Sequence, residues 1–144
     1  SNVYGPYDKF DLNKSHVFGA TISKILNNKN GIIEVWGNGE EKRNFIYVED
    51  LISFLFIAIK KQKNNFELYN LGDRKSISIK NLVKKIIKTS GKKLRITYNL
   101  SKPTLKTSIS IDSSKAIKDL GWKQKYNIDK GISKTIKWYK NYYK

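Results

Sequence analysis

Short strand-like segments alternate with amphipathic helical segments along almost the whole chain. Apolar and β-branched runs bounded by turn residues predict strands at 32–36, 44–48, 68–71, 94–98 and, more weakly, 108–111. Apolar residues at helical spacing predict helices at 16–29, 51–59, 78–91, 112–121 and from 127 to the C-terminal end. This alternation favours an α/β to mixed α+β fold with about five helices. Because no pattern joins the short strands into one sheet, we expect a lobe of a larger fold.

Several of these boundaries are marked by residues that start or stop helices. Ser15 and Ser78 are predicted N-caps, since a serine hydroxyl can accept a hydrogen bond from an unpaired helix N–H. Gly91 is predicted to end the helix after Ser78, because glycine readily adopts the left-handed conformation found there. Asp112 or Ser113 is expected to cap the short helix that follows. Residues 2–6 read as a turn because they contain a Gly-Pro pair.

The most apolar segment, residues 51–59, is too short to cross a bilayer. Glu49 and Asp50 precede it and lysines follow it, which matches the helix macrodipole and predicts a buried helix. No basic region followed by an apolar stretch opens the chain. We therefore expect a soluble, cytoplasmic protein with no membrane contact, either one domain or part of a larger one.

The chain has no cysteine and one histidine. This composition excludes a disulfide scaffold, a cysteine zinc site and a thiol nucleophile within the chain, so no metal is expected. His16 is a candidate acid, because imidazole exchanges protons near neutral pH. The alternative is a structural or exposed histidine, and no serine or aspartate partner for His16 can be named from spacing.

Lysine and arginine number 29 against 12 acidic residues, which gives a formal charge of +17. Such a charge attracts polyanions, so a nucleic-acid-binding module is an alternative function. The lysines are spread from Lys9 to Lys144 instead of gathering in one segment, which favours solvated surfaces and makes nucleic acid the weaker alternative. In either case the charge draws small anionic molecules toward the protein.

A tryptophan at a predicted strand end, Trp36, is followed by the turn Gly37-Asn38-Gly39 and then by Arg43. An indole can stack on a flat ring, and a guanidinium offers a fork of donors that suits phosphate oxygens. The alternative is a core tryptophan and an exposed arginine. The two glycines alone are too few for a phosphate-binding loop.

Five short motifs stand in a fixed order over essentially the whole chain. They are Asn2-Val3-Tyr4-Gly5-Pro6, Val35-Trp36-Gly37-Asn38-Gly39, Arg43-Asn44-Phe45-Ile46-Tyr47-Val48-Glu49-Asp50-Leu51, Tyr69-Asn70-Leu71-Gly72 and Leu120-Gly121-Trp122. In this order the motifs resemble the C-terminal part of extended short-chain dehydrogenases/reductases that act on nucleotide sugars. Ser15-His16-Val17 and Ser101-Lys102-Pro103 are similar to the GDP-L-fucose synthases of that family, NADPH-dependent enzymes that epimerise and reduce a GDP-4-keto-6-deoxy sugar.

The resemblance implies a cofactor contact and an acid. Asn2, Val3, Tyr4 and Gly5 would lie against the nicotinamide end of NADP (or NAD), together with His16. His16 would also be the general acid of the epimerisation.

The resemblance also implies a substrate site. Trp36, Arg43 and Lys102 would hold the nucleotide diphosphate-sugar, which is expected to be GDP-linked. Lys24 stands where the family's helix carries a substrate-binding arginine, and it keeps the charge without the bidentate fork. An arginine expected before Asp112 is replaced by Ser108, so the sugar and even the base remain open, and reductases and epimerases for other GDP-linked deoxy sugars or heptoses fit as well.

The family's glycine-rich cofactor fingerprint is not in the sequence, and Tyr126 with Lys130 has the Tyr-x-x-x-Lys spacing but lies in the wrong region for the family's catalytic pair. The resemblance therefore implies that residues 1–144 are the C-terminal substrate-binding portion of a longer, homodimeric enzyme. In such an enzyme, which would serve cell-surface polysaccharide biosynthesis, residues 45–61 and 68–71 would pack on the Rossmann domain. We then expect an exposed apolar patch around residues 51–59 and a tendency to self-associate. A non-catalytic nucleotide-sugar-binding or dimerisation lobe is the remaining alternative.

Overall fold

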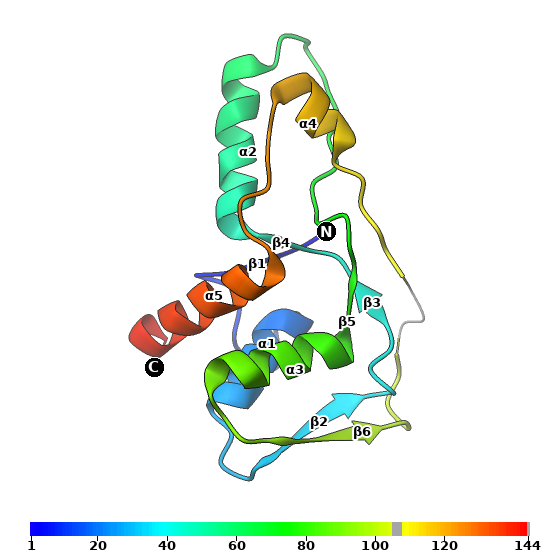
Figure 1. The fold of residues 1–144 in the computed structure, drawn as a ribbon, viewed down its shortest axis with the longest axis vertical. Coiled ribbons are helices and arrows are strands. Elements are labelled where there is room, and N and C mark those ends of the chain that lie inside the picture. The colour runs from blue at the N-terminus through cyan, green and yellow to red at the C-terminus, as the bar shows by residue number, and fades with distance from the viewer. Residues whose placement is uncertain (105–107, 144) are drawn as a thin grey trace.

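The structure is a computed structural model, and it describes residues 1–104 and 108–143. Within these residues the chain forms five helices and six short strands (Figure 1). In chain order these elements are β1 (Asn2–Tyr4), α1 (Val17–Leu26), β2 (Ile32–Trp36), β3 (Lys42–Arg43), β4 (Phe45–Tyr47), α2 (Val48–Lys61), β5 (Ile77–Ser78), α3 (Ile79–Ser90), β6 (Arg95–Asn99), α4 (Ser114–Leu120) and α5 (Ile128–Tyr142). The predicted mixture of about five helices with short strands is confirmed.

The strands form three separate two-stranded sheets in the described part of the chain. β1 runs parallel to β4, and β2 runs parallel to β6 with Ile32 opposite Arg95 and Trp36 opposite Asn99. β3 pairs with β5 in the antiparallel direction. The expectation that no single sheet collects the strands is therefore confirmed.

One turn prediction and one strand prediction were wrong. Residues 2–4 were expected to form a turn but form β1, because their hydrogen-bond partner β4 lies far along the chain, where local turn signals do not reach. Residues 68–71 were expected to form a buried strand but belong to no strand, and Leu68 is 68% exposed. Between residues 108 and 111 the structure has one isolated bridge, from Ser108 to Lys42.

Most of the predicted helix ends are confirmed. Ser78 caps α3 by accepting a hydrogen bond from the Asn81 backbone N–H at 3.4 Å, and Gly91 ends α3 in the left-handed conformation at φ 74°. The prediction for Ser15 was wrong, because His16 is the N-cap of α1 and makes no side-chain cap bond. At α4, Asp112 Oδ1 accepts from the Ser114 N–H at 2.8 Å, since the Ser113 hydroxyl is bonded to Gly72 instead.

Two clusters of buried side chains hold the fold together. The larger cluster joins α1, α3 and α5 to β2 and β4. The smaller one contains Phe54 of α2, Ala116 and Leu120 of α4, and Trp122. Figure 1 shows α2 and α4 together at one end of the molecule and β2 with β6 at the other. The apolar side chains of α4 therefore pack on α2.

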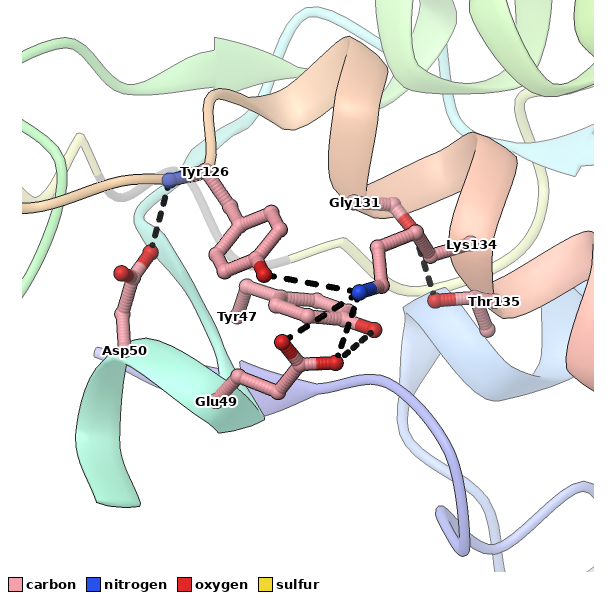
Figure 2. Close-up of polar contacts among 7 residues, drawn as sticks. All are labelled: Tyr47, Glu49, Asp50, Tyr126, Gly131, Lys134 and Thr135. Atoms are coloured by element: carbon pink, nitrogen blue, oxygen red, sulfur yellow. Dashed lines mark hydrogen bonds and ion pairs between the residues drawn. The ribbon is translucent and has the colours of Figure 1, made fainter. Parts of the chain in front are cut away.

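Polar contacts tie the start of α2 to the segment before α5 (Figure 2). The Asp50 side chain is fully buried and accepts backbone N–H bonds from Lys125 at 2.8 Å and Tyr126 at 3.1 Å. Lys134 Nζ lies 3.0 Å from a Glu49 oxygen, and the Tyr47 hydroxyl donates to Glu49 at 3.3 Å. Burial raises the pKa of Tyr47 to about 12. These bonds fix α5 against the joint between β4 and α2.

The outer face of α2 is apolar and exposed. Ile52, Leu55, Phe56 and Ile59 stand at positions i, i+3, i+4 and i+7 of the helix, and they are 45%, 50%, 63% and 79% exposed. The expectation of a buried helix is therefore wrong for this face, and the expected apolar patch is present. No helix in the described ranges is long and apolar enough to cross a membrane.

Candidate functional site

A cavity of about 350 Å³ lies between α1, β2, β3 and the start of α3. Its apolar wall comes from helix and strand residues that include Val17, Ile33 and Val83. Its polar lining comes from side chains on several elements, namely Ser15, Thr21, Lys24, Glu34, Trp36, Glu41, Arg43 and Thr104. An apolar wall with a small number of polar side chains is the composition usual for a small-molecule site.

Three of the four predicted substrate-binding residues line this cavity, and the fourth lies beside it. Lys24 is in the last turn of α1, Trp36 ends β2 and Arg43 lies in β3. Trp36 is 48% exposed, with Lys24 Nζ 6.0 Å and Lys102 Nζ 5.7 Å from its ring centre. A half-exposed indole with two ammonium groups near its ring can stack on a flat ring whose charged substituent meets the lysines.

Local sequence explains why these segments meet. β2 alternates strictly, so Ile33 and Val35 are buried while Glu34 and Trp36 face outward. Gly37 has φ 63°, and a Cβ built there would lie 3.3 Å from Thr104 Cβ and closer still to its methyl group. Glycine at this position therefore lets the loop of residues 101–104 approach the end of β2, which brings Lys102 to Trp36.

Ser15, which the sequence predicted to be a helix N-cap, instead contributes its hydroxyl to the cavity lining. Its Oγ is buried, Ser15 lines the cavity, and no residue in the described ranges hydrogen-bonds to Oγ. An unpaired buried hydroxyl is costly in water-free surroundings. A polar group of a bound molecule would satisfy it.

His16 is the N-cap residue of α1, and its side chain is exposed. Its neighbours Ser15 and Val17 line the cavity, whereas His16 itself is not part of the cavity wall. The nearby Asp8 carboxylate has one oxygen, Oδ2, that is buried without a hydrogen bond from any described residue, while Oδ1 accepts from the Lys9 N–H at 2.7 Å. Burial raises the pKa of Asp8, and the Lys9 hydrogen bond and the charges of His16 and Lys9 oppose this shift.

The predicted cofactor-contact residues lie apart from the cavity. The Asn2 side chain donates to the Asn44 carbonyl at 3.1 Å, and the Tyr4 ring is 3% exposed, 4.1 Å from the ring of Phe18. Val3 is 41% exposed, so β1 offers a ligand the Val3 side chain and its own backbone. Gly5 is required for packing, because a Cβ there would lie 2.7 Å from Val48 Cγ1. These residues lie in and beside β1, outside the cavity lining.

Among residues 1–104 and 108–143, no group of three or more His, Cys, Asp or Glu side chains is placed to hold a metal ion. The structure adds Ser15, Glu34 and Glu41 to the residues selected from the sequence. Glu34 could have been found from the sequence, since strand alternation places it on the same face as Trp36.

The chain is thus a mixed α/β structure with a cavity bordered by a tryptophan and by basic side chains. Residues 1–72, half of the chain, match the family described as the NAD dependent epimerase/dehydratase family. The chain belongs to this family.

Similar proteins agree with this assignment. A GDP-L-colitose synthase of Yersinia pseudotuberculosis is 36% identical over 143 residues, which cover 97% of this chain and 46% of that protein. A GDP-L-fucose synthase of Sinorhizobium fredii is 36% identical over 138 residues, 94% of this chain and 43% of that protein. The chain thus spans less than half the length of these curated relatives. A UDP-glucose 4-epimerase of Thermotoga maritima, solved with UDP-glucose, has the same fold, with a TM-score of 0.85 at 23% identity over 96% of this chain and 43% of that one.

Proposed function

We propose that this chain is the substrate-binding part of an NAD(P)-dependent nucleotide-sugar epimerase/reductase similar to GDP-L-fucose synthase. The observation that carries the proposal is the meeting of Lys24, Trp36, Arg43 and Lys102 around one cavity. These residues come from four segments of the chain. The names of the two curated relatives, a GDP-L-colitose synthase and a GDP-L-fucose synthase, support the substrate class.

Each of these side chains has a distinct binding role in the proposal. Trp36 stacks on the nucleotide base, and Arg43 binds diphosphate oxygens through its planar fork of donors. Lys24 and Lys102 add positive charge beside the ring. Binding energy from the diphosphate, remote from the reacting carbon, then holds the sugar in one orientation.

His16 is proposed as the general acid that returns a proton to the sugar carbon during epimerisation. Its place at the N-cap of α1, next to cavity residues Ser15 and Val17, supports this role. Val3, the backbone of β1, Gly5 and His16 are proposed to border the nicotinamide end of NADP or NAD, which supplies the hydride when bound. In a longer enzyme the epimerisation should fail in H16N while reduction of a simple ketone persists.

The apolar outer face of α2 supports a further part of the proposal. Residues 45–61 and 68–71 would pack on a Rossmann domain of the complete enzyme, and the complete enzyme would be a homodimer. In this chain alone Phe56 and Ile59 are 63% and 79% exposed, which is unfavourable in water unless another surface covers them.

Binding of GDP to the chain tests the proposal. We expect quenching of Trp36 fluorescence and, in the Arg43→Ala variant, a roughly tenfold or greater loss of affinity, because charge-assisted hydrogen bonds to phosphate are lost. Arg74→Ala is the matched control, since Arg74 is exposed and outside the cavity lining, and it should bind as tightly as the parent.

A duplex DNA of random sequence, titrated at two salt concentrations, is the competing ligand. Tight and steeply salt-dependent binding of the duplex, without binding of GDP, would replace the proposed function by nucleic-acid binding.

A further inference from the structure

The cavity lining carries two carboxylates, Glu34 and Glu41, as well as the basic Lys24 and Arg43. Glu34 lines this cavity and also a second, adjoining one of about 460 Å³, and it shares both with Lys24. It lies on the exposed face of β2, two residues before Trp36. A flat ring that stacks on Trp36 would therefore lie next to Glu34, because residues two apart on a strand point to the same face of the strand.

One oxygen of Glu34 is held in place. Asn99 Nδ2 donates to Glu34 Oε2 at 3.1 Å across the β2–β6 pair. The Asn99 side-chain oxygen accepts from the Ser101 N–H at 3.2 Å and the Ser101 hydroxyl at 2.7 Å, which orients the amide so that its nitrogen faces Glu34. In the described ranges, Glu34 Oε1 takes part in no hydrogen bond or ion pair. The carboxylate is oriented but retains acceptor capacity toward the cavity.

The negative charge of Glu34 determines which ligand groups can bind beside it. A negative charge near Lys24 opposes the binding of a diphosphate, so Glu34 favours binding only where the ligand presents N–H groups to it. Guanine carries two adjacent donors, N1–H and the N2 amino group, and these match the two oxygens of a carboxylate. Uracil and thymine carry one N–H between two carbonyls, and those carbonyls would be repelled.

We propose that Glu34 is the residue that selects the base, accepting hydrogen bonds from N1–H and N2–H of a guanine stacked on Trp36. Asn99 is its positioning residue. This inference rests on the proposed function, and it adds the base preference and the side chain that creates it. It predicts a preference for GDP-linked over UDP-linked and dTDP-linked molecules.

The experiment measures the affinities of GDP, UDP and dTDP for the chain and for three variants. The parent should prefer GDP over UDP by roughly tenfold or more. In Glu34→Gln the preference should disappear: the affinity for GDP falls about tenfold, while that for UDP stays the same or rises because a repelling charge is gone. Glu34 is exposed, so the change does not threaten the core.

Two further variants test whether the loss of base preference is specific to Glu34. Glu40→Gln removes a carboxylate that pairs with Lys80 outside the cavity, and it should keep the parent's preference. Glu41→Gln removes the other acidic side chain of the cavity lining and should also keep it.

The outcomes separate the two proposals. If the parent binds GDP but E34Q keeps the preference, or weakens GDP and UDP equally, the role of Glu34 is wrong and the proposed function stands. Loss of the preference in E41Q alone also overturns the role of Glu34. If the parent binds none of the three nucleotides, the proposed function fails and the base selection fails with it.

Discussion

Asp8 shows how one side chain can make the stability of the fold depend on pH. Its Oδ2 atom is buried with no hydrogen bond from the described residues, and burial raises the pKa of the carboxyl above its ordinary value of 3.8. The folded state therefore binds the proton more strongly than the unfolded state does. Stability that is present below pH 3.8 is lost as the pH rises through the higher folded pKa.

We expect Asp8→Asn to be more stable than the parent at pH 7. Asparagine removes the buried charge, and its side-chain oxygen can still accept the Lys9 N–H that Asp8 binds at 2.7 Å. The difference should shrink as the pH falls and vanish below the ordinary carboxyl value of 3.8. Urea unfolding of both proteins across this pH range checks the prediction. A variant less stable than the parent at pH 7 would show that Asp8 makes a favourable contact when charged.

Single residues also show which parts of the site were predictable. Trp36, Arg43 and Lys102 were selected through the family resemblance, because their motifs occupy short, ordered stretches of sequence. Ser15 was assigned to a helix cap, and its place in the cavity wall depends on α1 starting one residue later than expected. Glu34 was missed because strand alternation was used to find the core and not the ligand-facing side chains.

Helices were easier to predict than strands for a physical reason. The signals at Ser78 and Gly91 act within a few residues, and each one is where the sequence places it. β1 instead depends on hydrogen bonds to β4, and β3 depends on β5. Strands of two or three residues have too little pattern of their own, so their partners decide whether they form.

The contact between α5 and β1 depends on a glycine within a helix. A Cβ at Gly131 would lie 2.6 Å from Tyr4 Cζ and 2.8 Å from Tyr4 Cε2, distances that real side chains do not reach. Helix propensity alone predicts that Gly131→Ala stabilises the protein by about 1 kcal/mol. The close approach predicts the opposite sign, because Tyr4 is buried and cannot move away without disturbing the core.

We expect Gly131→Ala to lower the free energy of unfolding by about 2 kcal/mol net, measured by chemical denaturation. Ser133→Ala, at an exposed position of the same helix, is the control and should be neutral or slightly stabilising. Combining Gly131→Ala with Tyr4→Phe should recover part of the loss, since the hydroxyl is among the atoms that would clash. A stabilised Gly131→Ala protein would contradict the packing of α5 on β1.

At the scale of the whole molecule, the division of the buried side chains determines the surface. The larger cluster is enclosed by α1, α3 and α5, whereas the smaller cluster is covered on one side by α4 and leaves the outer face of α2 exposed. A net charge of +17 keeps copies of the chain apart at low salt, and screening by added salt weakens that repulsion. Charge and apolar surface therefore act in opposite directions on association.

We expect the chain to self-associate through the α2 face, more strongly at high salt, as seen by sedimentation velocity. Phe56→Glu should shift the equilibrium toward monomer, because Phe56 is 63% exposed at the centre of this face and a carboxylate there cannot be buried without cost. Leu100→Glu is the control, since Leu100 is 76% exposed next to β6, at the opposite end of the molecule. A parent that stays monomeric at high salt, or an L100E variant that dissociates as readily as F56E, would show that α2 does not mediate association.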